Sequence, residues 1–317
     1  MDSKKVMVTG GAGFIGSHLA LTLAEKNHCT VIDDLSTGRI QNIAQAISDH
    51  RLEFLQGTVT DLQFLQRSFE RVDYVFHQAA MVSVPRSMER PVDFALINII
   101  GTLNVLVAAK QNRVRKVIVA SSSSVYGETP DLPRNEQVKP SPQSPYAVSK
   151  LAGEHYCDVF SRSFSLPTVC LRYFNVYGPR QNPSSQYAAV IPKFIRRVLD
   201  SEPPIIFGDG NQTRDFTFVR DVVDANILAA ESDATGVFNI GTGKRISIND
   251  LAVIIMGLAG SRLTPVYEAE RSGDIRHSLA DISKASAIGY RPKYFLQDGI
   301  KETLKYISNA DEQRFSR

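Results

Sequence analysis

Three glycines at every third position stand between a short apolar segment and a helical pattern near the start of the chain. Gly10, Gly13 and Gly16 follow the apolar residues 6–8 and open the helical pattern. Glycines allow a tight turn and a close approach of the backbone to a pyrophosphate, and the N–H groups at the start of the next helix face that anion. The spacing predicts a dinucleotide-binding turn, with a strand-to-helix turn that binds no ligand as the alternative.

Short β-branched segments alternate with longer helical patterns as far as about residue 175. The expected strands are 6–8, 30–32, 54–55, 74–76, 117–120 and 168–171, and helices are expected near 14–26, 93–111 and 146–162. Such alternation predicts a parallel sheet with helices on both faces, which is a doubly wound α/β (Rossmann) fold. Ligands of that fold lie beyond the carboxyl ends of the strands.

A change of composition near residue 175 predicts a second, smaller lobe. Prolines gather between residues 179 and 204, whereas segment 237–241 has the pattern of one more strand of the main sheet. We therefore expect a discontinuous division into two parts. The Rossmann domain takes residues 1–174 plus about 219–243, and a substrate-binding lobe takes 175–218 plus 244–317. A chain of 317 residues is long enough for both.

Charge and cysteine content restrict the partners and the compartment. Lys and Arg number 36 and Asp and Glu 33, spread along the chain, so neither nucleic acid nor a membrane surface is expected as a partner. Cys29, Cys157 and Cys170 form no CxxC pair, which predicts reduced, packed thiols and a cytoplasmic protein, and no signal-peptide core precedes residue 6. The histidines show no HxH or HxxxH spacing, so no metal site is expected.

The longest uncharged run covers residues 94–109. It is shorter than the roughly 18 residues of a membrane-spanning helix and is interrupted by polar residues and a glycine. We expect a buried helix of the core, with a contribution to a dimer face as the alternative.

A carboxylate after the second expected strand bears on the choice of dinucleotide. Asp33 ends that strand, where its oxygens can accept hydrogen bonds from both hydroxyls of an adenine ribose and would repel a 2′-phosphate. This favours NAD over NADP. A carboxylate that only caps the next turn is the alternative, and it suits Asp34 better than Asp33.

A tyrosine and a lysine four residues apart supply a candidate base. Tyr146 and Lys150 share one face of an expected helix that opens with Ser144 and Pro145. A neighbouring ammonium and an oxidised nicotinamide both favour the phenolate, which makes Tyr146 a general base. The serine run 121–124 leaves a buried strand and faces the expected crevice. A helix-surface pair and a serine-rich loop tip are the alternatives.

Together these motifs resemble the extended short-chain dehydrogenase/reductase family, and within it the nucleotide-sugar 4-epimerases. The resemblance runs from Gly10 to about Tyr290. It is closest to UDP-N-acetylglucosamine 4-epimerases, which are relatives of UDP-glucose 4-epimerases, and is carried by segments 83–87, 171–176, 187–193 and 273–278.

The resemblance implies a role for each matching residue. Tyr146 is the base, Lys150 holds the nicotinamide ribose and tunes Tyr146, and Ser122 binds the sugar 4-oxygen. The implied substrate residues are Ser83, Ser123, Ser124, Asn175, Val190, Arg214, Arg271, Asp274 and Ser278. The implied NAD residues are Gly10, Gly13, Phe14, Ile15, Gly16, Asp33, Asp34, Ser36, Thr37, Gly38, Val59, Gln78, Ala79, Ala80, Asn98, Tyr146, Lys150 and Tyr173. Thr58 stands where the family commonly has an adenine-binding Asp, so we expect the backbone of Val59 to make that contact.

The implied reaction is an NAD-dependent C4 epimerisation of UDP-sugars through a transient 4-keto sugar, by a homodimer with tightly bound NAD. UDP-N-acetylglucosamine and UDP-N-acetylgalactosamine are the expected pair, because Ser278 is small where a bulky residue would exclude an acetamido group; UDP-glucose and UDP-galactose are further candidates. The alternatives are a UDP-glucuronate 4-epimerase or decarboxylase and a non-catalytic NAD-binding regulator. Serines at 123 and 124 argue against dehydratases and decarboxylases, which need a side-chain acid there.

Overall fold

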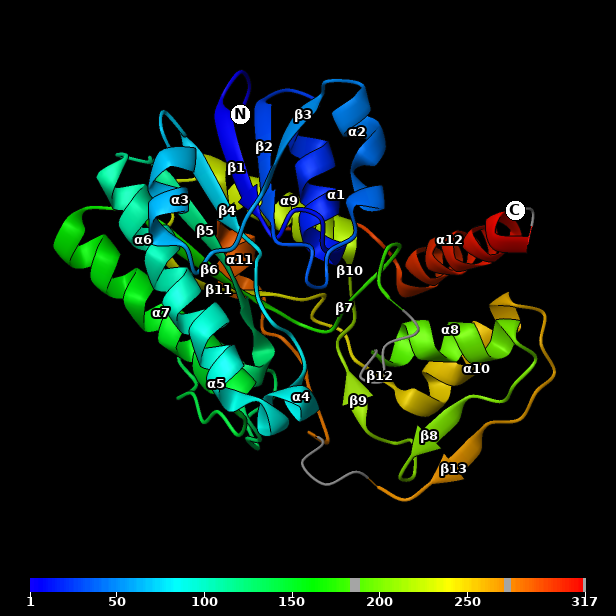
Figure 1. The fold of residues 1–317 in the computed structure, drawn as a ribbon. Coiled ribbons are helices and arrows are strands. Elements are labelled where there is room, and N and C mark those ends of the chain that lie inside the picture. Colours follow the sequence, from blue (N-terminus) through cyan, green and yellow to red (C-terminus); the bar gives the residue numbers. More distant parts are fainter. Residues whose placement is uncertain (183–188, 271–274, 316–317) are drawn as a thin grey trace.

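A parallel seven-stranded sheet forms the centre of the computed structural model, which describes residues 1–182, 189–270 and 275–315 (Figure 1). Its strands, in spatial order, are β11 (Gly236–Ile240), β6 (Thr168–Tyr173), β5 (Lys116–Ser122), β4 (Tyr74–His77), β1 (Lys5–Thr9), β2 (His28–Asp33) and β3 (Leu52–Gln56). The chain order reverses between β1 and β4, and a crevice opens at the carboxyl ends of strands at such a point. The predicted doubly wound fold and all seven expected strands are confirmed.

Helices cover both faces of the sheet (Figure 1). One face carries α1 (Phe14–Leu23), α2 (Ala44–Ser48) and α9 (Val219–Glu231), and the other carries α3 (Leu62–Ser68), α6 (Gly101–Gln111) and α7 (Pro145–Phe164). Successive strand residues point to opposite faces, so Val8 is buried in the first layer and Met7 in the second. Two apolar cores therefore hold the sheet rigid beneath the crevice.

The expected helix at 93–111 is longer than its apolar run. α5 (Pro91–Phe94), the π-helical segment η2 (Ala95–Ile100) and α6 follow one another without a break. Within the described residues, 91–111 form the one helix long and apolar enough to cross a membrane by length and composition, so our argument from length was wrong. Its buried residues Val105, Leu106 and Ala109 pack in the second core beside α3 and α7, as expected for a core helix.

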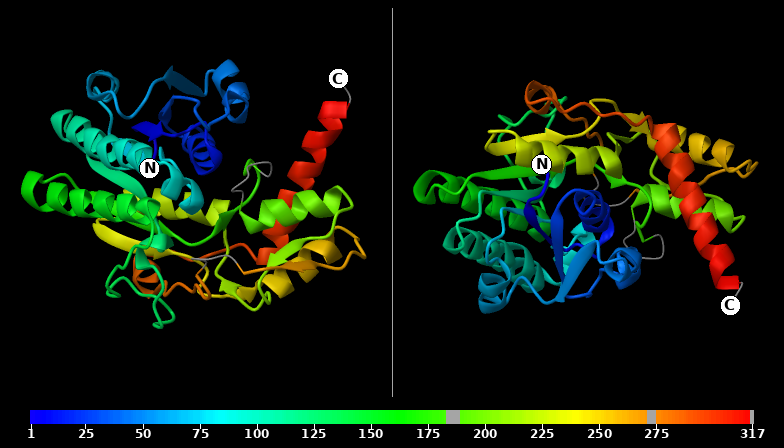
Figure 2. Two further views of the ribbon diagram at one scale, coloured as in Figure 1. Left: turned by 60° about the horizontal axis from the view of Figure 1, so that its bottom comes forward. Right: turned by 90° about the horizontal axis from the view of Figure 1, so that it is seen from above.

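Short strands and three longer helices build the smaller lobe around a third core (Figure 2). The strand pairs are β7 (Val176–Tyr177) with β10 (Thr217–Phe218), β9 (Thr213–Arg214) with β12 (Ile246–Ser247), and β8 (Ile205–Phe207) with β13 (Val266–Glu268). The helices are α8 (Val190–Leu199), α10 (Ile248–Leu258) and α12 (Leu296–Phe315). The chain enters this lobe after β6 and returns to the sheet with α9 and β11.

One segment packs differently from the expected division. α11 (Ser283–Ala287) lies against β11, and Ala285 and Tyr290 are buried in the first core of the sheet. The hydroxyl of Tyr290 donates to the carbonyl of Gly241 at 2.9 Å. The expected lobe of 244–317 therefore contains a segment, 283–290, that packs on the sheet, because a strand-edge helix is set by tertiary contacts rather than by local composition.

Candidate active site

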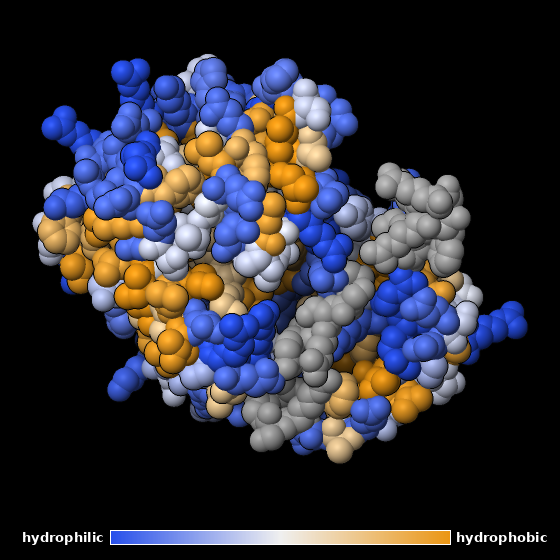
Figure 3. Space-filling view, viewed as in Figure 1, coloured by the Kyte–Doolittle hydropathy of each residue, from blue (hydrophilic) through white to orange (hydrophobic). Residues whose placement is uncertain are grey.

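A cavity of about 540 Å³ lies where the carboxyl ends of the central strands meet the small lobe. Figure 3 shows the molecule hollowed between these two parts. The sheet side contributes the glycine turn and the ends of β2, β4 and β5, and the lobe contributes Asn175, Arg214 and Ser278. One cavity is thus lined by most of the expected cofactor residues and by several of the expected substrate residues.

The glycine turn has no room for side chains. A Cβ on Gly16 would lie 2.1 Å from the carbonyl oxygen of Gly10, and one on Gly10, whose φ is +72°, would lie 2.5 Å from the amide nitrogen of Ala79. α1 begins at Phe14 after Gly13, and no side chain caps it. Its first N–H groups therefore remain available to an anion, as a pyrophosphate site requires.

Asp33 is held in place by backbone amides. Its Oδ2 accepts from the N–H of Ala12 at 3.0 Å and its Oδ1 from the N–H of Leu35 at 2.8 Å. Burial raises the pKa of Asp33, while these two hydrogen bonds oppose that rise. Gly38 is one of the expected cofactor residues, but it does not line the cavity. A Cβ added at Gly38 would lie 2.6 Å from Asp33 Oδ1, so this glycine leaves room for the carboxylate.

Tyr146, Lys150 and Ser122 meet at the wall of the cavity. α7 starts where Ser144 Oγ accepts from the N–H of Ala147 at 3.2 Å, which fixes the first turn that carries Tyr146. Burial raises the pKa of Tyr146, and its hydrogen bond with Ser122 acts in the opposite direction. The ring packs edge-on against Phe94 at 6.2 Å between centroids. The phenol is thus placed but needs a further positive charge to ionise near neutral pH.

Lys150 supplies that charge from one helical turn further along α7. Its Nζ donates to the carbonyl oxygen of Ala120 at 2.9 Å, and burial lowers its pKa to about 8. An ammonium with this pKa is still mostly protonated at neutral pH. It also keeps two N–H groups for a ligand, because an ammonium has three donors.

Residues 6–241 match the model of the NAD dependent epimerase/dehydratase family. The chain belongs to this family. The UDP-glucose 4-epimerase of Mycolicibacterium smegmatis is 38% identical over 313 residues, covering 97% of this chain and 100% of that protein. These matches confirm the resemblance to nucleotide-sugar 4-epimerases that the motifs indicated.

Solved structures of this epimerase family superpose along nearly the whole chain. The UDP-N-acetylglucosamine 4-epimerase of Methanobrevibacter ruminantium M1, in complex with UDP-N-acetylmuramic acid, gives a TM-score of 0.95 at 44% identity, covering 98% of this chain and 100% of its own. The UDP-glucose 4-epimerase of Thermotoga maritima with UDP-glucose gives 0.92 at 39%, covering 96% and 99%. These relatives are isomerases that act on nucleotide sugars.

The cofactor of the epimerase family is NAD, and this chain's residues fit it. The bare glycine turn and uncapped α1 suit the pyrophosphate, and Asp33 suits a ribose without a 2′-phosphate. Most of the expected cofactor residues line the cavity: Gly10, Gly13, Phe14, Ile15, Gly16, Asp33, Asp34, Ser36, Thr37, Val59, Gln78, Ala79, Ala80, Tyr146, Lys150 and Tyr173. Thr58 does not line it, and its Oγ1 accepts from the N–H of Thr60 at 3.3 Å.

Asn98 acts behind the cavity instead of in it. Its Oδ1 accepts from the N–H of Met81 at 2.8 Å, and its Nδ2 donates to the carbonyl of Met81 and to Ser149 Oγ. The side chain is buried, and these partners occupy both donors of its amide group. Asn98 does not line the cavity, and its expected direct contact with NAD stays a prediction. Asn98 connects the loop of residues 78–82 (the 80s loop), which lines the cavity, to helix α7.

The expected substrate residues fall into four groups, of which Ser83 forms the last. Ser123, Ser124, Asn175, Arg214 and Ser278 line the cavity. Val190 lines a second cavity of about 250 Å³, which Asn175 and Arg214 also line. Arg271 and Asp274 lie outside the described residues.

Ser83 is also an expected substrate residue, but it does not line the cavity. It caps α4 (Val84–Glu89), where its Oγ accepts from the N–H of Arg86 at 3.2 Å. Its φ of 145° is a backbone conformation that side-chain-bearing residues rarely adopt. The serine hydroxyl is used locally, because it caps a helix whose Val84 lines the cavity.

Sequence reasoning missed several residues of the cavity wall. Met81, Val82 and Ile97 come from the 80s loop and η2, and Gln181, Ala189 and Ile275 come from the lobe. Their residue types carry no chemistry that a motif search would find, since most of them offer only apolar surface. Gln181 is the polar exception, and its Nε2 donates to the carbonyl of Val176 at 3.2 Å.

Replacing Asp33 tests the cofactor half of the site. Asp33→Ala removes the carboxylate acceptor, so NAD affinity should fall by about 10- to 100-fold, the usual value of hydrogen bonds to a charged group. NADP should bind better than to the wild type, since the charge that repels its 2′-phosphate is gone. Binding titrations with both dinucleotides, and chromatography of the dinucleotide released on denaturation, measure both effects.

The neighbouring carboxylate provides the comparison for Asp33. Asp34 is exposed and its Oδ1 accepts from the N–H of Ser36 at 2.9 Å. Asp34→Ala should therefore weaken NAD binding less than Asp33→Ala and should not admit NADP. The reverse order, or NADP as the dinucleotide released from the wild type, would show that Asp33 does not select the cofactor.

Proposed function

We propose that the enzyme interconverts UDP-N-acetylglucosamine and UDP-N-acetylgalactosamine by inverting C4, with NAD as a tightly bound cofactor. The observation that carries this proposal is that a half-buried tyrosine, a lysine and small serines share one cavity with a lobe-side arginine. Tyr146 and Ser122 lie on the sheet side of that cavity, and Arg214 and Ser278 on the lobe side. A sugar diphosphate bridging the two sides would present its sugar to Tyr146.

The chain's own residues handle the proton in this proposal. The phenolate of Tyr146 takes the proton of the 4-hydroxyl, and Ser122 donates to the 4-oxygen as the carbonyl forms. The ammonium of Lys150 stabilises the phenolate, and the same phenol later returns the proton to the inverted oxygen. Bound NAD supplies the hydride acceptor and donor for C4. The 4-keto sugar has to turn over within the pocket between the two transfers.

The second cavity supports a pyrimidine nucleotide at the far end of the substrate. It is lined by Val190, Phe194, Phe207 and Phe216, with Gln212 as a polar group. Apolar and aromatic walls with few polar groups suit a planar base. Arg214 lines both cavities, and its Nη1 donates to the carbonyls of Thr213 and Arg276. A guanidinium so placed is suited to a diphosphate between base and sugar.

The serine segment and Ser278 support an epimerase of N-acetylated sugars. Segment 121–124 carries hydroxyls and no carboxyl group, so it offers no side-chain acid for a dehydration or a decarboxylation. Ser278 is 4% exposed, and its N–H donates to the carbonyl of Thr213 at 3.0 Å. Its side chain is short, so we expect the pocket beside it to have room for an acetamido group.

One assay tests the proposed function against its alternatives. The purified protein is incubated separately with UDP-N-acetylglucosamine, UDP-glucose and UDP-glucuronate, and the products are separated by chromatography. We expect conversion of the N-acetylated sugar to its galacto epimer. Conversion of UDP-glucose alone would overturn the sugar assignment, and an epimer or a decarboxylated product from UDP-glucuronate alone would indicate the other enzymes. No conversion with NAD bound would indicate a regulator.

We also propose that the enzyme is a homodimer, and a stripe of exposed apolar side chains supports this. Val92, Leu96 and Ile100 are 77%, 48% and 43% exposed and recur at every fourth position of helix 91–111. Val148 and Val159 add to them from α7, which packs beside α5 and η2. Figure 3 shows apolar side chains gathered over these helices. A two-fold pairing would remove the stripe from water.

A charge in the middle of the stripe tests the dimer. Leu96→Asp should convert the dimer to a monomer in light scattering coupled to size exclusion, because burying an unpaired carboxylate costs several kcal/mol. Val253→Asp is the matched control: this valine is 64% exposed on α10, outside the stripe. An unchanged mass for Leu96→Asp would show that the stripe is not the interface.

A cytoplasmic location is part of the same proposal. Cys29, Cys157 and Cys170 are buried and form no disulfide, as expected for a protein kept under reducing conditions.

A further inference from the structure

A buried carboxylate stands directly behind the candidate catalytic residues. Glu154 follows Lys150 by one helical turn on α7, so that Tyr146, Lys150 and Glu154 form one row along the helix. Tyr146 and Lys150 line the cavity, whereas Glu154 does not and is 5% exposed. A charge so deeply buried needs partners, and their positions show what the charge does.

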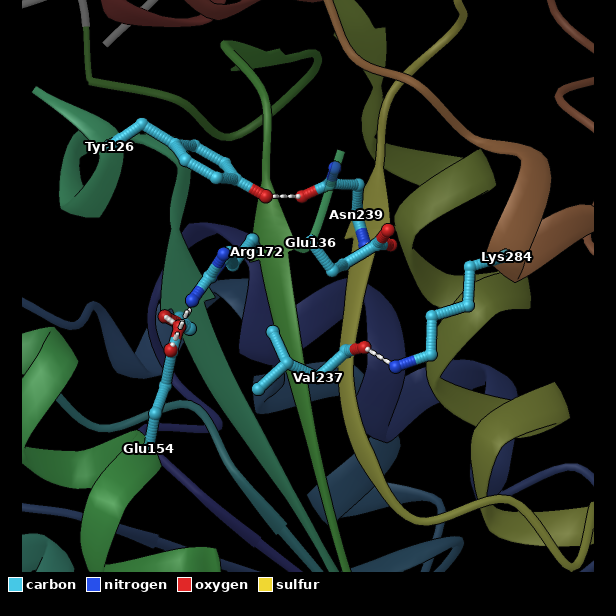
Figure 4. A network of polar contacts seen from close by, with 8 residues as sticks. Tyr126, Glu136, Glu154, Arg172, Val237, Asn239 and Lys284 are labelled. Atoms are coloured by element: carbon cyan, nitrogen blue, oxygen red, sulfur yellow. Dashed lines mark hydrogen bonds and ion pairs between the residues drawn. The ribbon is translucent and has the colours of Figure 1, made fainter. Parts of the chain in front are cut away.

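The partners of Glu154 come from the two strands that carry the cavity wall (Figure 4). Arg172 on β6 donates from Nε to Oε1 at 2.9 Å and from Nη2 to Oε2 at 2.7 Å, and Ser121 on β5 donates to Oε1. The guanidinium also stacks on the ring of Tyr126 at 4.6 Å, and the Tyr126 hydroxyl donates to Asn239 Oδ1 on β11 at 2.8 Å. The pair is therefore fixed to β5, β6 and β11 at once.

Few charges face Lys150 from the elements packed around it. From β4 comes His77, whose Nε2 must donate to Thr102, because the Thr102 hydroxyl itself donates to the carbonyl of Asn98. Burial and the Lys150 charge lower the pKa of His77 to about 3, so the ring is neutral.

From β6 come Cys170 and Arg172. The pKa of Cys170 lies far above its ordinary value, because of its hydrogen bond with Cys157 and its burial, so this thiol stays protonated while Lys150 titrates. Besides Tyr146, which is neutral until it serves as the base, α7 brings Glu154. Within the described part of the chain, the fixed charge that acts on Lys150 is therefore the carboxylate of Glu154, and the guanidinium of Arg172 is the ion-pair partner of that carboxylate.

We propose that the Glu154–Arg172 pair is a positioning element that sets the charge balance at Lys150, and through it the ionisation of Tyr146. Glu154 favours the ammonium of Lys150, and Arg172 offsets most of that effect while holding the carboxylate in place. The inference rests on the proposed roles of Tyr146 and Lys150. Neither Glu154 nor Arg172 lines the cavity, so in this proposal they act only through Lys150 and Tyr146.

We expect two single variants to shift the alkaline limb of the pH–rate profile in opposite directions. Glu154→Gln removes the negative charge and leaves Arg172 unpaired, so Lys150 should lose its proton earlier and the limb should move down by about one pH unit. Arg172→Gln leaves Glu154 unpaired, so Lys150 should hold its proton longer and the limb should move up by a similar amount. The profiles are kcat against pH for UDP-sugar epimerisation.

A purely structural role predicts another pattern. Both variants would then lose activity at every pH, with the limb unmoved or moved the same way, and either result overturns the proposal. The neutral double variant, Glu154→Gln with Arg172→Gln, should shift less than either single variant. Arg172→Lys, which keeps the charge, should bring the alkaline limb back most of the way to its wild-type position.

Separate controls identify a variant that fails to fold and a failure of the proposed function itself. Circular dichroism and thermal unfolding identify any single variant that does not fold. The double variant leaves no unpaired charge at this site and still carries a prediction of its own: a large shift in it overturns the proposal. A wild-type protein without epimerase activity would refute the proposed function before any variant is compared, so the two failures are distinguishable.

Discussion

Tyr146→Phe should lower kcat for UDP-sugar epimerisation by about 10²- to 10⁴-fold, the usual contribution of a positioned general base. The variant keeps the ring and its edge-on contact with Phe94, so the helix and the cavity wall stay in place. Only the hydroxyl that takes the substrate proton is lost. The dissociation constants of NAD and of the UDP-sugar should change little, which calorimetry or equilibrium dialysis can measure beside the turnover assay.

Tyr156→Phe is the matched control for this experiment. Tyr156 lies on the same helix but is 36% exposed and away from the cavity, so its variant should keep wild-type turnover. Near-normal turnover of Tyr146→Phe would remove the tyrosine from the mechanism, and a loss caused by weakened substrate binding would make it a binding residue.

Ser278→Tyr should lower kcat/KM for the N-acetylated UDP-sugars by about 10²-fold while activity on UDP-glucose persists or rises. Ser278 is buried at the lobe side of the cavity, and its backbone is held by Thr213 and by the neighbouring contacts of His277. The new ring cannot move out of the pocket by shifting this segment. It therefore clashes first with the larger substituent of the sugar.

Ser278→Ala separates pocket width from local structure. The alanine keeps the pocket open but removes the hydroxyl, so preference between the two sugar pairs should stay as in the wild type. If Ser278 only stabilised the turn before residues 279–281, then the Ala variant would lose activity on all substrates and the Tyr variant would lose both pairs equally. That pattern would place the control of sugar choice elsewhere.

Local periodicity and turn chemistry were sufficient to predict the sheet. Each expected strand lies within an observed one or overlaps it, including β11, because short β-branched segments between glycines and polar turns have few other places to pack. The glycine turn could be predicted equally well, since backbone atoms around Gly10 and Gly16 leave no room for a Cβ and glycine is therefore required at both positions.

The structure departs from the expected cavity lining where a side chain has two possible uses. Asn98 and Ser83 carry polar groups suited to a ligand, but tertiary neighbours use them: Met81 and Ser149 for Asn98, and the first turn of α4 for Ser83. Gly38 serves Asp33 by its small size. A sequence shows that a donor or acceptor exists, and only the packed structure shows which partner has taken it.

The route of the chain through the two parts governs how the protein can be made and altered. The edge strand β11 joins β6 only after the segment from β7 to β10 has passed through the lobe, and α11 returns to the sheet after a second passage. A nascent chain therefore cannot complete its sheet until about residue 240 has left the ribosome, and a truncation near residue 175 leaves β6 as an open edge. Neither half can be cut out and exchanged as a cassette. Point changes in the wall of the cavity can alter sugar choice without disturbing this shared framework.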